Sequence, residues 1–259
     1  MTDIVRVSLA GAAFVLFLSA PLLAQTPQSS GAGGKAGHAA ATCPLLPRPN
    51  ALWSLAQCCS RDLASRPSCR VYDAKDEYVI IKDNAPTKPD AYLIIPTIKV
   101  TGIEDSRIFE LPVVDFWAYG WSRSKQYPGQ PAPRTGLAIN SKYARSENQL
   151  HIHISCARAD VSQTLESRDI PMYPAQDVTL PLGPHGRPYD AVKVTGLSGA
   201  NSPFEVIQDI PGVKDSMPDE SIAVIGSPKA GEYYVVNTRH HGSDRGDAEE
   251  LLDETCQTR

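Results

Sequence analysis

Two histidines in an alternating stretch are the residues best suited by type and spacing to do chemistry. Polar and apolar side chains alternate in Gln149-Leu-His-Ile-His-Ile-Ser-Cys156. On a strand, His151 and His153 would share one face about 6.5–7 Å apart, and the apolar residues would face the core. Imidazole is a nucleophile, a proton carrier and a metal ligand. The alternation alone leaves open a catalytic pair, a metal site, or an edge strand that exposes histidines by chance.

The residues around this stretch predict strands and helices in an α+β order. β-Branched runs at 77–83 and 91–96 flank a Pro- and Asn-containing turn, which indicates an antiparallel hairpin. A second hairpin is expected at 222–225 and 233–237, and residues 169–189 read as a Pro-rich loop. The other expected elements are helices at 51–62, 111–126 and 247–256 and strands at 137–140 and 149–156. Trp117 and Trp121, one helical turn apart, are expected to pack in the core.

The order of these elements and four short segments resemble a known family. The segments are YVIIKD, YLIIPT, LAINSKYARSENQLHIHISC and AEELLDETC. They are similar to CDP-diacylglycerol diphosphatases, a membrane-associated branch of the histidine-triad superfamily, over roughly residues 50–256, most specifically at 137–156. The resemblance implies a histidine-triad-like antiparallel sheet with packed helices, extended by a C-terminal α/β half, in one hydrolase domain spanning 46–259. It also implies conversion of CDP-diacylglycerol to CMP and phosphatidate without a metal or other cofactor.

The resemblance assigns roles to individual residues. His151 matches the nucleophile that forms a nucleotidyl-histidine, and His153 the neighbour that contacts phosphate oxygens and assists the leaving group. The implied substrate contacts are Asp83 to the ribose, Asn140 to the nucleotide, and Ser146, Asn148 and Lys99 to the phosphates.

The sequence departs from the family motif at Gln149, which stands at the first triad position in place of histidine. Glutamine can donate a hydrogen bond to the substrate but cannot titrate, a change that bears on the rate and the pH profile.

Two alternative functions remain open at this point. One is a hydrolase or transferase of soluble nucleoside-diphosphate compounds, and the other is a non-catalytic nucleotide-binding exported module, which Gln149 would suit. The net charge of −4 argues against a general nucleic-acid binder. The adjacent His240 and His241 are expected in an exposed loop and not at a metal, since neighbours on a strand point to opposite faces.

The N-terminus and the cysteines point to export. Residues 7–24 are uncharged and apolar, so residues 1–24 are expected to be a signal peptide or a membrane anchor, followed by a flexible linker at 25–45. This predicts a bacterial protein in the periplasm or on the periplasmic face of the inner membrane, with the membrane surface as a partner; oligomeric state is left open. The six cysteines indicate disulfides. The four N-terminal cysteines are close enough in sequence for one or two local bridges, and Cys156 and Cys256 could join distant parts of the chain, but the sequence leaves the connectivity open.

Overall fold

The computed structural model describes residues 43–257. The predicted export segment and residues 25–42 of the predicted linker lie outside the described residues. The last linker residues, 43–45, lie within them and are tied to the domain by the disulfide Cys43–Cys58. Among residues 43–257, no helix is both long and apolar enough to cross a membrane.

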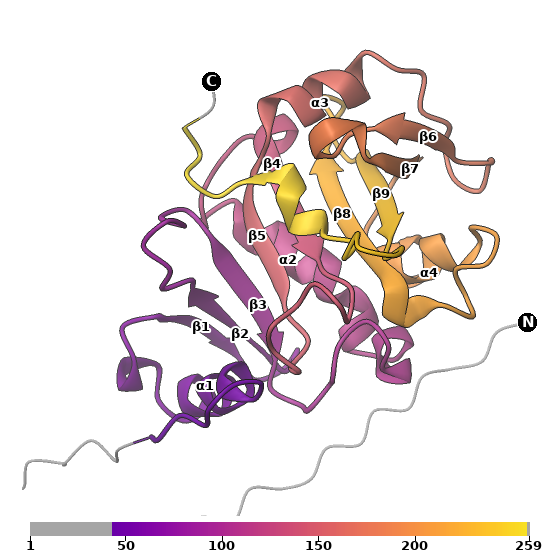
Figure 1. Ribbon diagram of the computed structural model, residues 1–259. Helices are drawn as coiled ribbons and strands as arrows, with labels where there is room; N and C mark the ends of the chain where they lie inside the picture. Colours follow the sequence, from indigo (N-terminus) through magenta and orange to yellow (C-terminus); the bar gives the residue numbers. More distant parts are fainter. Residues whose placement is uncertain (1–42, 258–259) are drawn as a thin grey trace, which may run out of the picture. The chain divides into compact units, whose positions relative to one another are not determined.

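One antiparallel sheet runs through both halves of the chain (Figure 1). Within residues 43–257 its ten strands have the spatial order β1-β2-β3-β5-β4-β8-β9-β7-β6, and β10 pairs with β5 next to the end of β3. The C-terminal half, which the sequence predicts as α/β, continues this sheet through the β4–β8 pair with antiparallel neighbours. The strands are β1 Cys69–Asp73, β2 Tyr78–Lys82, β3 Tyr92–Pro96, β4 Thr135–Ile139, β5 Ile152–Ala157, β6 Val178–Pro181, β7 Pro188–Val194, β8 Glu220–Gly226, β9 Tyr233–Arg239 and β10 Leu252–Asp253.

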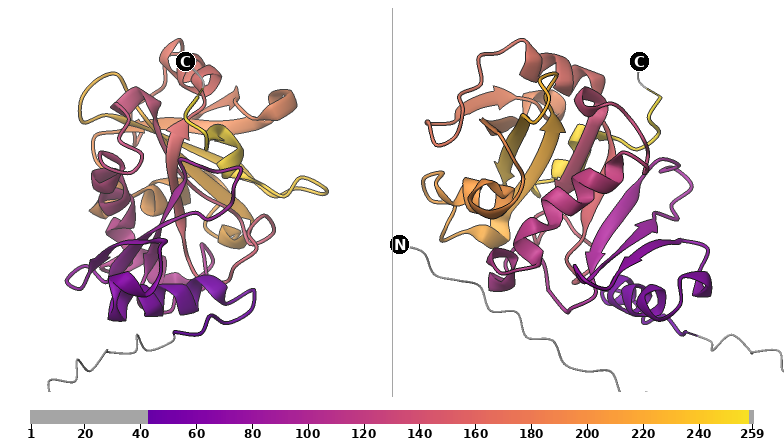
Figure 2. Two further views of the ribbon diagram at one scale, coloured as in Figure 1. Left: turned by 90° about the vertical axis from the view of Figure 1, so that its left-hand side faces the viewer. Right: turned by 180° about the vertical axis from the view of Figure 1, so that it is seen from behind.

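Helices cover both faces of the sheet. Helix α2, Phe116–Ser124, and helix α4, Pro203–Gln208, pack on one face, where Trp117 and Phe204 are fully buried beside Ile94 and Ile154. Figure 2 shows α2 lying across the sheet when it is seen from behind. Strands covered on both faces read as continuous apolar runs, which explains the sequences of β2, β4 and β8.

The opposite face carries two separate apolar clusters with a gap between them. At one end, helix α1, Ala51–Arg61, packs its Leu55 and Ala56 on Val79, Ile81 and Leu93 of the first hairpin. At the other end, helix α3, Ala159–Glu166, and the 3-10 turn Ala248–Leu251 pack on β4, β8 and β9. His153 points to this face because it pairs with Leu93 on one side and Ala138 on the other. The gap between the clusters is therefore where polar side chains of the sheet remain accessible.

Several predicted elements are confirmed. The hairpins β2–β3 and β8–β9, the helix α1, the core position of Trp117 and the α+β class agree with the sequence analysis. The structure settles the disulfide connectivity that the sequence left open, and it joins Cys156 to Cys256. A third disulfide joins Cys59 to Cys69.

Other elements differ from the prediction. The predicted helix at 111–126 is α2 alone, preceded by the 3-10 turn Val113–Asp115. The predicted loop at 169–189 contains β6, and the predicted terminal helix at 247–256 is wrong. A single 3-10 turn, capped by Asp247, gives way to β10, because Leu252 and Asp253 take their hydrogen-bond partners from β5. The histidine strand begins at Ile152 and lies between β3 and β4, so it is not an edge strand.

Candidate active site

A cavity of about 340 Å³ occupies the gap between the two apolar clusters. One wall is apolar and comes from α1 and the first hairpin, with Leu52, Leu55, Ile81 and Leu93. The other wall is polar and contains the predicted catalytic histidines, both of which are buried. The cavity thus presents an apolar surface opposite a group of titratable side chains, as binding sites for amphipathic small molecules do.

His151 is held in one tautomer by the backbone. Its Nδ1 lies 2.7 Å from the carbonyl oxygen of Gln149, and a carbonyl only accepts hydrogen bonds, so Nδ1 must carry the proton. When the ring is neutral, Nε2 therefore has a free lone pair. Burial, and next to it the charge of His153, lowers the pKa of His151 to about 4. At neutral pH His151 is an uncharged imidazole with an available nucleophilic nitrogen.

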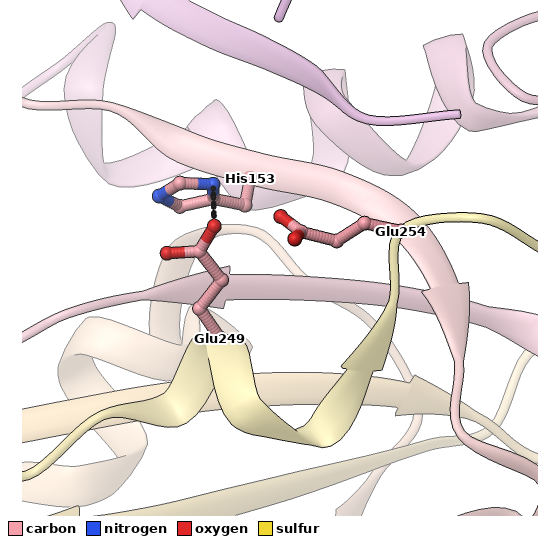
Figure 3. Close-up of side chains that lie close together, drawn as sticks. All are labelled: His153, Glu249 and Glu254. Atoms are coloured by element: carbon pink, nitrogen blue, oxygen red, sulfur yellow. Dashed lines mark ion pairs between the residues drawn. The ribbon is translucent and has the colours of Figure 1, made fainter. Parts of the chain in front are cut away.

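His153 has the opposite electrostatic environment. Its Nδ1 lies 3.1 Å from Oε1 of Glu249, an ion-pair distance without the angle of a hydrogen bond (Figure 3). Burial alone would lower the pKa of His153, but the Glu249 carboxylate outweighs burial and the pKa is raised. The rings of His151 and His153 are 5.1 Å apart, edge to face. Two neighbouring imidazoles whose pKa values are pushed apart can divide the work of nucleophile and acid between them.

Glu249 organises several side chains of the polar wall. Its Oε2 accepts a hydrogen bond from Nδ2 of Asn140 at 3.0 Å, and its backbone N–H donates to Oδ1 of Asn140 at 3.1 Å. Lys88 pairs with Glu249 and also with Glu254, whose Oε1 is 2.9 Å from Nζ. Burial acts to raise the pKa of Glu249, but His153 and Lys88 hold it well below its usual range. The Glu249 carboxylate is therefore ionised at neutral pH, where it can act as the counterion of protonated His153.

The same cluster contains residue types that can bind a metal ion. One ligand atom each from His153, Glu249 and Glu254 lie within 4.8 Å of one another (Figure 3). However, the ammonium of Lys88 already lies against both carboxylates. Burial and Glu249 raise the pKa of Glu254 to about 7, so this carboxyl is a weaker ligand than an ordinary glutamate. A metal ion would have to displace Lys88, and the donor set fits an ammonium better than a divalent cation.

Cationic side chains near the cavity provide a field for phosphate groups. Arg145 lines the cavity and is held by both carboxylate oxygens of Glu104. Lys82 also lines it, and its Nζ donates to the backbone carbonyls of Asp83, Lys88 and Ala91, which fixes the turn after β2. Arg48 and Lys88 complete the set of cationic lining residues.

The structure brings most of the predicted site residues together. His151, His153, Asp83, Asn140 and Ser146 all line the cavity. Oδ1 of Asp83 accepts a hydrogen bond from the backbone N–H of Ala85 at 2.9 Å, which leaves Oδ2 for a ligand.

The structure does not bring Lys99, Asn148 and Gln149 to this cavity. Lys99 and Asn148 are exposed and are not among its lining residues. Gln149 is 2% exposed, and its Nε2 donates to the carbonyl oxygens of Pro96 at 3.0 Å and Ile98 at 2.8 Å. Its amide therefore holds the chain after β3 in place, and the departure from the triad motif has a structural role in the fold.

Comparison with known proteins identifies the family. A family model described as CDP-diacylglycerol pyrophosphatase matches residues 47–259. The chain belongs to the CDP-diacylglycerol pyrophosphatase family. It is 31% identical over 224 residues to a CDP-diacylglycerol pyrophosphatase of Yersinia pestis, covering 80% of this chain and 84% of that protein.

This member of the CDP-diacylglycerol pyrophosphatase family is also similar to solved structures. It is similar to yeast Ap4A phosphorylase Apa2, with a TM-score of 0.42 and 10% identity, covering 71% of this chain and 64% of that one. It is also similar to a DUF4931 family protein of Bacillus cereus, with a TM-score of 0.42 and 9% identity, covering 67% of this chain and 86% of that one.

The sequence analysis missed two residues of this CDP-diacylglycerol pyrophosphatase site, Lys88 and Glu249. Lys88 lies in the turn between β2 and β3, and Glu249 lies in the 3-10 turn before β10. The segment AEELLDETC contributed to the family resemblance, which was the available signal for Glu249. No local pattern points to Lys88, because its partner is 161 residues away.

Proposed function

We propose that this chain hydrolyses the pyrophosphate bond of CDP-diacylglycerol to CMP and phosphatidate through a nucleotidyl-histidine on His151. The observation that carries the proposal is the hydrogen bond from Nδ1 of His151 to the carbonyl of Gln149. It leaves Nε2 unprotonated in a cavity that also holds the imidazole of His153, whose pKa is raised by Glu249. The family and its relative in Yersinia pestis favour CDP-diacylglycerol as the substrate.

In the first step, Nε2 of His151 attacks the phosphorus of the CMP moiety. A P–N bond forms, the P–O bond to the second phosphate breaks, and phosphatidate leaves with the bond's electron pair. His153 donates its proton to the departing oxygen, because the Glu249 carboxylate keeps His153 charged until that point. Arg145 and the neighbouring cations reduce the charge that builds up on the phosphates.

In the second step, water attacks the phosphorus of the nucleotidyl-histidine. The P–N bond breaks, CMP leaves, and Nε2 of His151 recovers its lone pair. His153, now neutral, accepts the proton of the attacking water and returns to its charged form beside Glu249. Covalent catalysis of this kind replaces one difficult hydrolysis by two easier displacements.

The remaining lining residues take binding roles in this proposal. Asp83 accepts hydrogen bonds from the ribose hydroxyls, and Ser146 donates to a phosphate oxygen. Asn140 contributes through its hydrogen bonds with Glu249 and through the part of its amide that faces the cavity. The phosphate contacts predicted for Lys99 and Asn148 stay predictions.

We also propose that the protein works in the periplasm or on the periplasmic face of the inner membrane. Three disulfides within the described residues fit an oxidising compartment. Residues 1–24 would serve as the signal peptide or the anchor.

The test is CMP release from CDP-diacylglycerol in detergent micelles with a chelator present. Wild type should turn over, and His151→Ala should lose activity by at least roughly 10³-fold. His241→Ala is the matched control, because His241 is exposed and does not line this cavity. Intact mass after rapid acid quenching should show a CMP adduct on wild type and none on His151→Ala. Full activity in His151→Ala would refute the mechanism.

A further inference from the structure

The first described residues are folded back along helix α1. The disulfide Cys43–Cys58 fixes one end of this segment, and a guanidinium hydrogen bond from Arg66 holds the carbonyl of Cys43. In the middle, the backbone N–H of Leu46 donates to Oγ of Ser54 at 2.9 Å. The positions of the side chains that follow Cys43 are therefore set by the fold.

This fixed segment exposes two adjacent leucines, of which Leu45 lines the cavity. Leu45 is 43% exposed and Leu46 is 51% exposed, and Leu45 also lines the cavity beside Leu52 and Leu55. A single exposed leucine is common on protein surfaces and needs no explanation. Here Leu45 continues the apolar wall of a binding cavity onto the surface, and Leu46 adds a second exposed leucine directly beside it in the chain.

The cavity opens where its lining residues are exposed. These residues are Leu45, Arg48, Asn84 and Ser146. Arg48, Asn84 and Ser146 are the polar residues of this opening, and Leu45 is its apolar residue. If the nucleotide of a substrate lies at Asp83, the apolar end of the same substrate would leave the cavity past Leu45.

The size of the cavity requires most of a lipid substrate to stay outside. About 340 Å³ is at the lower end of the range for drug-sized ligands. It suits a nucleotide and a diphosphate, and two long acyl chains do not fit with them. The acyl chains must therefore stay outside the cavity, in the bilayer, while the diphosphate reaches His151. The part of the lipid that connects the diphosphate to the acyl chains must then lie against the rim of the cavity.

We propose that Leu45, Leu46 and Arg48 form a leucine rim that docks on the bilayer surface and admits the lipid headgroup to the cavity. This inference rests on the proposed function. The leucines would enter the interfacial region. The side chain of Arg48 pairs with Glu147 through Nε at 3.3 Å but is 73% exposed, so the outer part of its guanidinium would meet anionic headgroups. In the sequence, the rim follows the apolar run at 7–24, which is the segment expected to be the signal peptide or anchor, after only a short stretch of residues.

The test uses the full chain and compares two substrates. One is CDP-diacylglycerol in vesicles of phosphatidylcholine and phosphatidylglycerol, and the other is a water-soluble CDP-dibutyrylglycerol. Leu46→Ser is the variant, because Leu46 does not line the cavity. We expect turnover on vesicles to fall about fivefold through weaker interfacial binding, with unchanged turnover of the soluble substrate. Leu46→Phe, which keeps a large apolar side chain at this position, should have the wild-type rate on vesicles.

Leu111→Ser is the matched control, since Leu111 is 74% exposed and does not line the cavity. Equal rates of wild type and Leu46→Ser on vesicles would overturn the leucine rim, and so would equal losses on both substrates. A lipid-free dimer that Leu46→Ser dissociates would also overturn it, in favour of a second copy of the chain as the occupant. Failure of wild type on both substrates would instead remove the proposed function itself.

Discussion

The carbonyl oxygen of Gln149 accepts a hydrogen bond from Nδ1 of His151, two residues further along the chain, at 2.7 Å. This contact makes the backbone, and not a neighbouring side chain, the group that selects the histidine tautomer. The glutamine side chain points elsewhere and binds the chain after β3. The substitution of the first triad histidine therefore leaves the tautomer of His151 unaffected.

The rate of CMP release should depend on pH through both histidines. His151 must be neutral to attack, so kcat/KM should fall as the pH drops through its pKa of about 4. His153 must be protonated to assist the leaving group, so kcat/KM should also fall as the pH rises through its raised pKa. A bell-shaped profile whose acid limb lies well below pH 6 is expected. An acid limb near pH 6.5 would show that His151 is not desolvated as described.

Glu249→Gln should move the alkaline limb of this profile to lower pH. The amide cannot supply the charge that raises the pKa of His153, so burial would then dominate and the proton would be lost earlier. We expect about a tenfold loss at pH 8 and a smaller loss at pH 6. Glu250→Gln is the control, because Glu250 pairs with Arg187 outside the cavity. A uniform loss at all pH values would assign Glu249 a purely structural role.

Gln149→Ala should affect stability more than catalysis. The variant leaves the carbonyl oxygens of Pro96 and Ile98 without their buried donor, which should cost about 3 kcal/mol in urea unfolding. Gln57→Ala is a matched control, since Gln57 donates to the carbonyl of Thr97 from α1. If Gln149→Ala loses activity while Gln57→Ala does not, Gln149 contacts the substrate as the family motif implies.

Replacing Cys156 and Cys256 by serine should lower both stability and kcat. The disulfide closes 100 residues, so its loss should cost up to about 4.7 kcal/mol on the chain-entropy estimate. It also fixes the position of residues 250–256, the segment that directly follows Glu249 and contains Glu254. Removing the Cys59–Cys69 disulfide, which closes 10 residues, should cost less, about 2.7 kcal/mol, and leave kcat nearly unchanged. If removing either disulfide changes kcat by the same factor, the C-terminal segment has no specific influence on the active site.

The sequence predicted those parts of the fold that local patterns determine. The β-branched runs of β2 and β3 and the turn between them were sufficient for the first hairpin. The terminal helix was wrong because the hydrogen bonds of Leu252 and Asp253 come from β5, which is far away in sequence. Helix propensity has no information about such a partner.

The same distinction applies to the site. The spacing of His151 and His153 pointed to the histidine pair, and family resemblance added Asp83, Asn140 and Ser146, which share the cavity. Lys88 and Glu249 were missed because their roles exist only once β5, the 88–91 turn and the C-terminal segment meet. Lys99 was placed at the phosphates from its position after the hairpin, but it is exposed away from the lining residues of the cavity.

The pairing of His153 with Glu249 joins residues that are 96 positions apart, 249 minus 153. A contact between residues so far apart in sequence forms only after a large loop has been closed, and closing that loop costs conformational entropy. Such contacts therefore form late in folding. Before the Cys156–Cys256 disulfide forms, the local hairpins β2–β3 and β8–β9 can therefore pair while His153 still lacks its counterion. During refolding, the return of enzymatic activity should trail the return of the circular dichroism signal, and activity would be the stricter measure of a completed native state.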